Sequence, residues 1–377
     1  MSSSVFITPA HMIEAQLQAR GWTQRTLAKV LGLHEQTISS LMKGRTTISA
    51  ELALQLKEIL DIDADELLKL QASFELKKAA LEFRPDPALV TRAKVFGELP
   101  VADMIARGWL RNVDNLWDSR LNESLCSFFG VDSIQDIEVL PHAAKKTDVM
   151  GEATAEQIAW LYRVTQIARK TLVAQYSHSA VADAIRELKP LLVSAEGVRK
   201  APRILSDAGI RYAIVESLPT AKIDGVCLWL DDKSPVIGMS LRFDRIDNFW
   251  FVLRHELEHI MKGHGQSAAM LDVSLEGDRT GTGPDIPEEE RIANAAAAEF
   301  CVPQAQLKKF VQIKSPFFAE RDIRGFAATY KIHPGLVAGQ LQHKTKRYDL
   351  FRNHLAKIRS VITPNAMVDG WGDVAPI

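Results

Sequence analysis

The N-terminal part of the chain alternates short amphipathic segments with turn residues. Between residues 9 and 75, apolar residues recur every three to four positions, the spacing that places them on one face of an α-helix. Gly32 and Gly44 interrupt this pattern, and glycine commonly follows the last turn of a helix. The pattern therefore predicts a bundle of short helices, in which residues 24–31 and 35–42 form two helices joined by a tight turn.

The central part of the chain keeps a helical pattern but carries no chemical motif. Helical segments are expected near residues 88–107, 112–129 and 154–193. A proline-containing stretch, residues 84–87, precedes them and marks a boundary, because proline interrupts regular structure. We interpret residues 81–195 as a helical connector.

After Gly197 the pattern changes to short strands and longer helices. Strands are expected at residues 211–217, 225–230, 235–241 and 268–275, with a hairpin turn at 231–234. Helices are expected at residues 243–263 and 288–301, followed by two shorter ones over 323–341. The basic segment 343–359 is expected to be a solvated helix face, and the last dozen residues are expected to be loose.

The composition narrows the class of protein without naming it. The chain has 377 residues, enough for two or three domains, and a net charge of −1, which indicates neither nucleic-acid nor membrane binding by the chain as a whole. Cys126, Cys227 and Cys301 are far apart and odd in number, so a disulfide framework is not indicated. No signal peptide and no membrane-spanning run is recognised, and we expect a cytoplasmic protein with no membrane partner.

The helix expected at residues 243–263 carries the clearest chemical motif, His-Glu-x-x-His. Residues four apart share one face of a helix, so His255 and His259 can bind one metal ion. Glu256 would lie beside that ion and act as the general base that takes a proton from an attacking water. The alternative is a pair of solvated histidines on a charged helix face, but the apolar residues that flank the motif favour the metal site.

Zinc requires a third protein ligand when its fourth position is left for water. Glu290, in the helix expected at 288–301, is the candidate, and Asn294 lies one turn later on the same face, where it can orient a ligand. Glu288 and Glu289 are expected to stabilise the positive N-terminus of that helix. Two alternatives stay open, that Glu290 does the same and that Glu289 is the ligand.

This half of the chain resembles the ImmA/IrrE-type metallopeptidases over roughly residues 195–340. The resemblance rests on His255-Glu256-Leu257-Glu258-His259, Glu290, Ala293-Asn294 and Pro303. It implies a zincin-like α+β fold, one zinc ion per chain and a gluzincin-like endopeptidase activity toward helix-turn-helix repressors. Glu258 replaces the usual glycine and Arg254 replaces a small residue, and these departures are expected to affect activity more than metal binding.

The N-terminal segment resembles the Cro/C1-type helix-turn-helix domains of the XRE family, especially antitoxins of the HigA type. The residues that carry this resemblance are Gly21-Trp22-Thr23-Gln24, Leu27-Ala28, Leu31-Gly32-Leu33, Gln36-Thr37-Ile38-Ser39, Leu41, Gly44-Arg45 and Ile48-Ser49-Ala50-Glu51-Leu52-Ala53. The resemblance implies binding of double-stranded operator DNA. A homodimer is expected because one short helix rarely reads enough sequence. His34 stands where the family usually has serine, which weakens the cap of the third helix.

The predicted DNA contacts fall into two groups. Outward side chains of the third helix would meet base edges, and the residues concerned are Glu35, Gln36, Thr37 and Ser40. Phosphate contacts are expected from Thr23, Gln24, Lys43 and Arg45. The alternative is that this module serves protein contacts or dimerisation.

The sequence therefore predicts a mainly α protein with a small α+β domain. Its expected parts are a helix-turn-helix DNA-binding domain at 1–80, the connector at 81–195, a zinc metallopeptidase-like domain at 196–345, and a C-terminal helix and tail at 346–377. The expected function is that of a DNA-binding regulator that cleaves a repressor, an antitoxin or itself in a stress-response, toxin–antitoxin or mobile-element circuit. The alternative is a HigA-like antitoxin or repressor without enzymatic activity, whose metal domain only binds or senses.

Overall fold

The structure is a computed structural model that describes residues 8–84, 99–137, 144–146, 153–266, 269–273 and 287–376. The chain divides into two compact units, residues 1–89 (the N-terminal unit) and residues 90–377 (the C-terminal unit). The helix predicted near 88–107 falls largely on residues 85–98, which lie outside the described residues.

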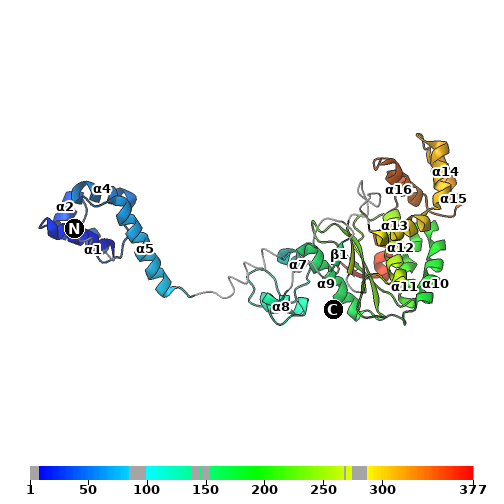
Figure 1. Cartoon of the computed structure of the whole chain (residues 1–377), viewed down its shortest axis with the longest axis horizontal. Coiled ribbons are helices and arrows are strands. Elements are labelled where there is room, and N and C mark those ends of the chain that lie inside the picture. The colour runs from blue at the N-terminus through cyan, green and yellow to red at the C-terminus, as the bar shows by residue number, and fades with distance from the viewer. Residues whose placement is uncertain are drawn as a thin grey trace. The chain divides into compact units, whose positions relative to one another are not determined.

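The described part of the N-terminal unit is a bundle of short helices (Figure 1). They are α1 (Pro9–Ala19), α2 (Gln24–Leu31), α3 (Glu35–Met42), α4 (Ala50–Leu60) and α5 (Ala64–Glu82). Their apolar stripes meet in one core that includes Ile13, Leu27, Ile38, Leu56 and Leu67. The predicted helical bundle, with its turn between α2 and α3, is confirmed.

Polar residues before these helices fix where they begin. Thr23, Ser49 and Asp63 each accept a hydrogen bond from the backbone N–H three residues later, at distances of 3.1, 3.1 and 2.9 Å. Such N-caps satisfy donors that the helix itself leaves without a partner. Gly32, with φ of 67°, ends α2 in the left-handed conformation that favours glycine.

The C-terminal unit combines one sheet with many helices. Its α-helices are α7 (Val101–Ala106), α8 (Leu121–Phe129), α9 (Ala155–Lys170), α10 (His178–Leu188), α11 (Ala201–Asp207), α12 (Ile246–Lys262), α13 (Glu288–Cys301), α14 (Gln304–Lys314), α15 (Glu320–Thr329), α16 (Pro334–Thr345) and α17 (Arg359–Ile362). Its 3-10 helices are η1 (Ile134–Asp136), η3 (Lys189–Val193), η4 (Ala195–Lys200), η5 (Arg352–His354) and η6 (Thr363–Asn365). Its strands are β1 (Ala144–Lys146), β2 (Arg211–Val215), β3 (Ile223–Trp229), β4 (Pro235–Met239), β5 (Ala269–Val273) and β6 (Met367–Asp369).

The six strands form one mixed sheet in the order β1-β5-β3-β4-β2-β6. β3 runs antiparallel to both of its neighbours, with Val226 opposite Gly238 of β4 and Leu271 of β5. β2 is parallel to β4 and β6, and β1 is parallel to β5. The predicted hairpin between β3 and β4 is confirmed, because the backbone N–H of Ser234 donates to the carbonyl of Asp231 at 3.1 Å.

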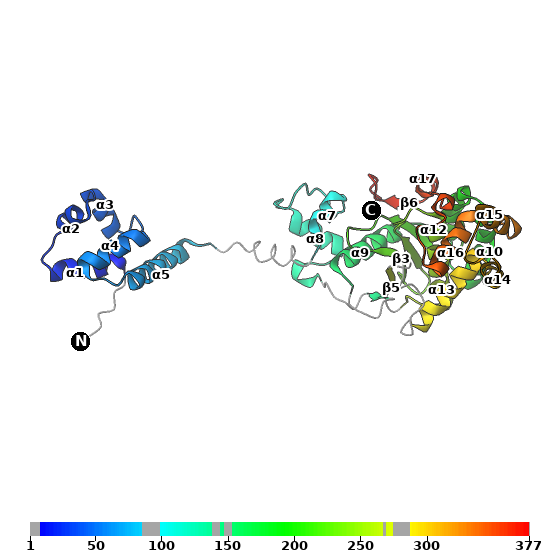
Figure 2. The same ribbon diagram turned by 90° about the horizontal axis from the view of Figure 1, so that it is seen from above.

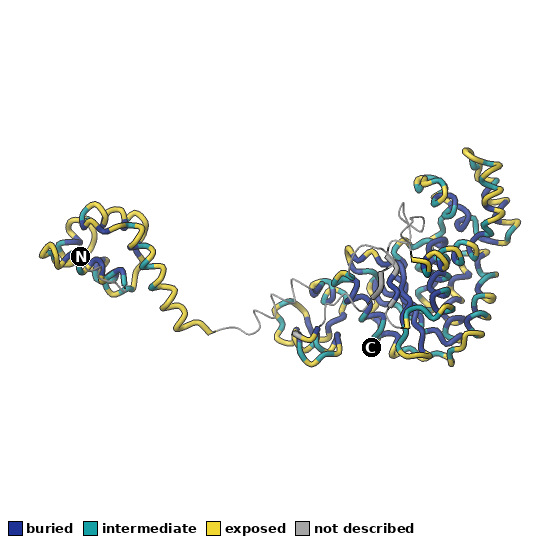
Figure 3. The backbone as a smooth tube through the Cα atoms, viewed as in Figure 1, coloured by how far each residue is buried: buried dark blue, intermediate teal, exposed yellow. Residues whose placement is uncertain are grey.

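Helices cover both faces of this sheet (Figure 2). Along β2, Ala213 and Val215 pack in a core with α9, whereas Tyr212 and Ile214 pack in a second core with α10 and α12. Successive residues of a strand point to opposite faces, so a sheet covered twice needs apolar residues at nearly every position. β2, β3, β4 and α12 are accordingly largely buried (Figure 3).

The end of the chain differs from its prediction. The last dozen residues were expected to be loose, but Met367–Asp369 forms edge strand β6 and Asp369 is buried. Nε of Arg163, on α9, donates to the Asp369 carboxylate at 2.9 Å, and Nε1 of Trp109 donates to it at 2.6 Å. Buried hydrogen bonds therefore hold the C-terminal segment against the sheet.

The prediction that residues 343–359 form a basic helix is also wrong. α16 ends at Thr345, and Lys346 adopts a left-handed conformation with φ of 56°. The remainder of the segment contains only the short 3-10 helix η5 and the start of α17. In the C-terminal unit, α9 packs directly on β2, so part of the segment interpreted as a connector belongs to the core of the sheet.

Candidate metal centre and nucleic-acid interface

Helix α12 brings the motif residues into the core of the C-terminal unit. Apolar side chains surround it, and Gly263 ends it with φ of 70°. His255, Glu256 and His259 are fully buried, with no exposed surface. Their burial removes the solvated-histidine alternative, because neither imidazole ring faces solvent.

Helix α13 completes the cluster with Glu290. The Nε2 atoms of His255 and His259 lie 2.9 Å apart. Nε2 of His255 lies 3.2 Å from Oε2 of Glu290, and Nε2 of His259 lies 3.4 Å from Oε1 of Glu290. One ligand atom from each residue lies within 4.8 Å of the others. Glu289 is half-buried and belongs to no such group among the described residues, so Glu290 is the carboxylate that the structure brings to the histidines.

The donor atoms of this cluster suit a divalent cation. Two imidazole nitrogens facing each other cannot both carry a proton at that distance, whereas a cation between them would accept a lone pair from each. Burial raises the pKa of the Glu290 carboxyl, but the neighbouring imidazoles of His255 and His259 outweigh burial and lower that pKa below its usual value. Two imidazoles and one ionised carboxylate form a ligand set that zinc commonly takes.

Glu256 lies on the neighbouring face of α12, against strand β3. The α-carbon of Gly225 approaches so closely that a side chain there would clash with Oε1 of Glu256 and would lie 2.8 Å from Cγ1 of Val252. Gly225 thus makes room for the carboxylate between the helix and the sheet. The close approach of Gly225 therefore holds the Glu256 carboxylate against β3, on the residue that follows His255 in α12.

His264 is a residue of this site that the sequence reasoning missed. It follows the left-handed turn at Gly263, which returns its backbone N–H to the carbonyl of His259 at 2.9 Å. Its Nδ1 lies 3.0 Å from Nδ1 of His259. Burial, and then the neighbouring His259, lower the pKa of His264. A neutral His264 can accept a hydrogen bond from the protonated Nδ1 of His259, which leaves Nε2 of His259 unprotonated as the ligand atom.

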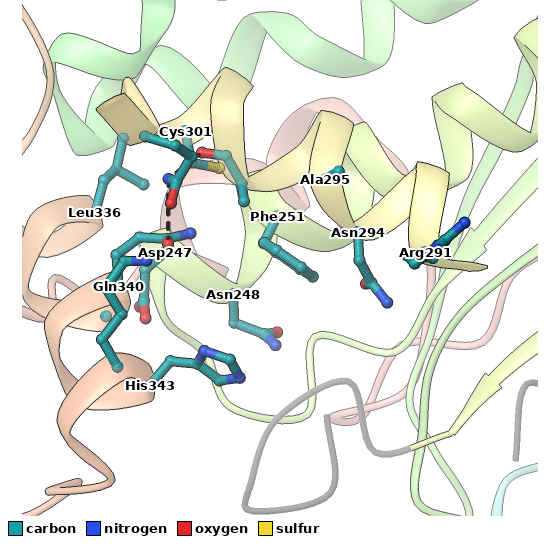
Figure 4. A pocket seen from close by; sticks show the side chains of 14 residues that line it. Asp247, Asn248, Phe251, Arg291, Asn294, Ala295, Cys301, Leu336, Gln340 and His343 are labelled. Carbon is teal, nitrogen blue, oxygen red and sulfur yellow. Dashed lines mark hydrogen bonds between the residues drawn. The ribbon is translucent and has the colours of Figure 1, made fainter. Parts of the chain in front are cut away.

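Three other residues lie near the motif, and their effects on metal binding and activity remain predictions. Arg254 and Glu258, the departures from the family pattern, form an ion pair of 2.7 Å with each other, so their charges offset one another. Asn294 lies one turn from Glu290 and lines a pocket between α12, α13 and α16 (Figure 4). Its role in orienting a ligand remains a prediction.

In the N-terminal unit, α2 and α3 meet in the predicted helix-turn-helix arrangement. Seven of the eight predicted DNA-contacting side chains are exposed, and the eighth, Ser40, is half-buried. His34 precedes α3 and makes no side-chain cap hydrogen bond, as expected from its chemistry. The structure adds one contact, because Nε of Arg25 on α2 lies 2.8 Å from Oε1 of Glu35 on α3.

A search of the described helices finds none that is both long and apolar enough to cross a membrane. Residues 13–67 match the family model described as Helix-turn-helix. No curated protein and no solved structure matches the chain. The matched residues span α2, the turn and α3, and they extend into α5. The chain therefore carries a Cro/C1-type helix-turn-helix domain that binds double-stranded DNA, and it is a DNA-binding transcriptional regulator.

Proposed function

We propose that this regulator is also a zinc-dependent endopeptidase. The observation that carries the proposal is the fully buried group of His255, His259 and Glu290, held by two packed helices next to a buried glutamate. An acidic or histidine cluster on a surface is commonly solvated, but burial of three such groups is costly unless they are paired or bind a cation. Zinc at one ion per chain is the cation that fits this ligand set best.

The chain's own residues account for the remaining chemistry. A zinc ion held by these ligands would act as a Lewis acid on the carbonyl of a peptide bond. Glu256 would take a proton from the attacking water at one carboxylate oxygen and transfer it to the leaving amine nitrogen. His264 would hold His259 in the tautomer that leaves its Nε2 free to bind.

The proposed substrate is a protein that acts in the same regulatory circuit. A helix-turn-helix domain in the same chain supports a repressor or an antitoxin as the target, including a copy of this chain, and the circuit would be a stress-response, toxin–antitoxin or mobile-element circuit. We propose that the DNA-binding unit acts as a homodimer on two operator half-sites, since one recognition helix offers only a few base contacts.

A metal and cleavage experiment tests the proposal. Purified full-length protein is expected to contain about one zinc ion per chain, and His255→Ala is expected to lose it. Glu256→Gln keeps all three ligands, so it should retain zinc and lose cleavage of helix-turn-helix repressors from the same genome. A folded wild-type chain that takes up no zinc when zinc is supplied would overturn the proposal.

A second candidate function is a repressor or antitoxin that binds or senses metal without catalysis. One observation favours it, namely that the Glu256 side chain has no exposed surface where a general base must meet water. Under this alternative, wild type and Glu256→Gln would bind zinc equally and would leave every tested repressor intact. Metal-dependent operator binding by both proteins would then support it directly.

A further inference from the structure

A pocket of about 310 Å³ lies in the groove between α12 and α13, with α16 as its third wall (Figure 4). Helices α12 and α13 pack more extensively on each other than any other pair of elements. Three apolar side chains from the three helices face the pocket, namely Phe251, Ala298 and Leu336. The groove is therefore open and apolar at a position where the two helices otherwise pack closely.

The pocket continues the groove that holds the histidines and Glu290. On α12, Phe251 precedes His255 by one turn, and their rings stack with centroids 6.4 Å apart. On α13, Asn294 follows Glu290 by one turn and lines the same pocket. A helical turn rises about 5.4 Å, so the pocket begins roughly that far from the cluster.

Two side-chain amides that line the pocket have no hydrogen-bond partner among the described residues. Asn248 is only 6% exposed, and its amide makes no hydrogen bond to any other residue that the structure describes. The amide of Asn294 likewise has no partner among the described residues, and both amides face the pocket (Figure 4). Asn294 is half-buried, and both amides can be reached by a ligand in the pocket that offers hydrogen-bond donors and acceptors. A peptide main chain offers N–H and C=O groups in alternation and suits both amides.

The charged residues around the pocket favour a negatively charged ligand. Asp247 lines it, but Arg245 holds this carboxylate through two hydrogen bonds and offsets its charge. Lys344 lines the pocket and forms no ion pair with another described residue, and Arg291 pairs only with the exposed Glu288. Lys344 therefore gives the rim a basic charge, while Phe251, Ala298 and Leu336 give the pocket an apolar wall.

We propose that this pocket selects the substrate by binding an extended peptide with a large apolar side chain that has acidic neighbours. The apolar side chain would lie against Phe251, Ala298 and Leu336, and the main chain would bond to Asn248 and Asn294. Acidic side chains next to it would meet Lys344 and Arg291. This inference rests on the proposed peptidase function, because it assigns the pocket to the substrate that would be cleaved.

Peptide binding can be measured apart from cleavage in the full-length Glu256→Gln chain. The probe is the peptide Gly-Asp-Phe-Asp-Gly, acetylated at its N-terminus and amidated at its C-terminus. Titration calorimetry measures its affinity for the chain. Two comparison peptides replace the central Phe with Gly, or both acids with Lys. The probe is expected to bind at least about tenfold more tightly than either comparison peptide, because each lacks one of the two features that the pocket recognises.

Variants of α13 locate the site. Ala298→Phe fills the pocket and should weaken binding of the probe at least about tenfold, whereas Ile292→Phe places the same side chain at an exposed position of the same helix away from the pocket and should change nothing. Asn294→Ala removes one amide without adding bulk, and it should weaken binding about fivefold even if Ala298→Phe does not fold. Equal binding of the three peptides, or full affinity in both pocket variants, would overturn the inference.

The two proposals fail in different ways. If the chain binds the probe selectively but neither binds zinc nor cleaves protein, the proposed peptide-binding pocket is supported and the proposed peptidase function is wrong. If wild type and Ala298→Phe both cleave protein with zinc and neither prefers apolar and acidic sequences, the peptidase function is supported and the proposed selection by the pocket is wrong.

Discussion

His259 and His264 face each other through their Nδ1 atoms, 3.0 Å apart, across the turn that ends α12. Only one of the two nitrogens can carry the proton of this hydrogen bond. If Nε2 of His259 binds a metal ion, Nδ1 of His259 carries the proton, and Nδ1 of His264 accepts the hydrogen bond. His264 is therefore a positioning residue for a ligand, although it holds no metal itself.

The first prediction follows from this pair of rings. His264→Ala should lower zinc affinity about tenfold or more, because the ring of His259 loses the partner that fixes its tautomer and orientation. His264→Gln keeps a side-chain acceptor and should lose much less. Competition with a fluorescent zinc chelator measures both affinities, and equal affinity in wild type and both variants would remove His264 from the site.

The second prediction concerns Gly225 and Glu256. Gly225→Ala adds a methyl group where it would clash with the Glu256 carboxylate, so Glu256 must move away from the cluster while the three ligands stay in place. We expect zinc content to stay near wild type and the cleavage rate to fall at least about tenfold, since general-base catalysis depends on placement of the base.

Gly325→Ala is the matched control for this substitution. Gly325 lies within α15, and a methyl group there would meet no atom within 4 Å. Alanine favours helix over glycine, so this variant should keep full activity and gain up to about 1 kcal/mol of stability. Full activity in Gly225→Ala as well would show that the position of Glu256 against β3 has no part in the chemistry.

The third prediction concerns the buried pair that anchors the C-terminus. Asp369→Ala leaves the buried guanidinium of Arg163 without its carboxylate, and we expect a loss of about 3–5 kcal/mol in the free energy of unfolding. Glu320→Ala breaks the exposed pair with Arg324 and should cost less than about 1 kcal/mol. Urea denaturation followed by circular dichroism compares the two, and similar midpoints would contradict the assignment.

The sequence predicted the elements whose signal is local. Helix α13 has the predicted bounds Glu288–Cys301, because its run of alanines and its terminal proline are both strong local signals. The hairpin between β3 and β4 was also predicted, since Asp231 and Ser234 are typical turn residues. His255, His259 and Glu290 were predicted to come together, because helical spacing and ligand chemistry constrain them.

Features that depend on distant contacts were not predictable in this way. Strand β6 has only three residues, and its strand character comes from pairing with β2, whose residues lie far away in the sequence. The contact between His264 and His259 depends on Gly263, which ends α12 and turns the chain back toward the helix. The pocket between α12, α13 and α16 depends on how three helices pack, which no spacing in the sequence specifies.

The fourth prediction separates base contacts from phosphate contacts in the N-terminal unit. On an operator selected from random DNA, Gln36→Ala should weaken binding by about 1–3 kcal/mol and relax the preference at one base pair. Lys43→Ala should weaken binding to all sequences alike and reduce the slope of log affinity against log salt concentration by about one. Fluorescence anisotropy at several salt concentrations measures both, and a salt slope unchanged in Lys43→Ala would remove it from the phosphate contacts.

The last prediction concerns the start of α3, the helix expected to read the operator. His34 occupies the N-cap position and makes no side-chain hydrogen bond to the helix, whereas Thr23, Ser49 and Asp63 cap their helices. His34→Ser supplies a hydroxyl that can accept from the backbone N–H of Thr37, which should stabilise α3 by about 1 kcal/mol. His34→Ala offers no acceptor and serves as the control. Hydrogen exchange of the α3 amides should slow in His34→Ser relative to His34→Ala, and equal exchange in the two variants would show that the missing cap does not limit the stability of this helix.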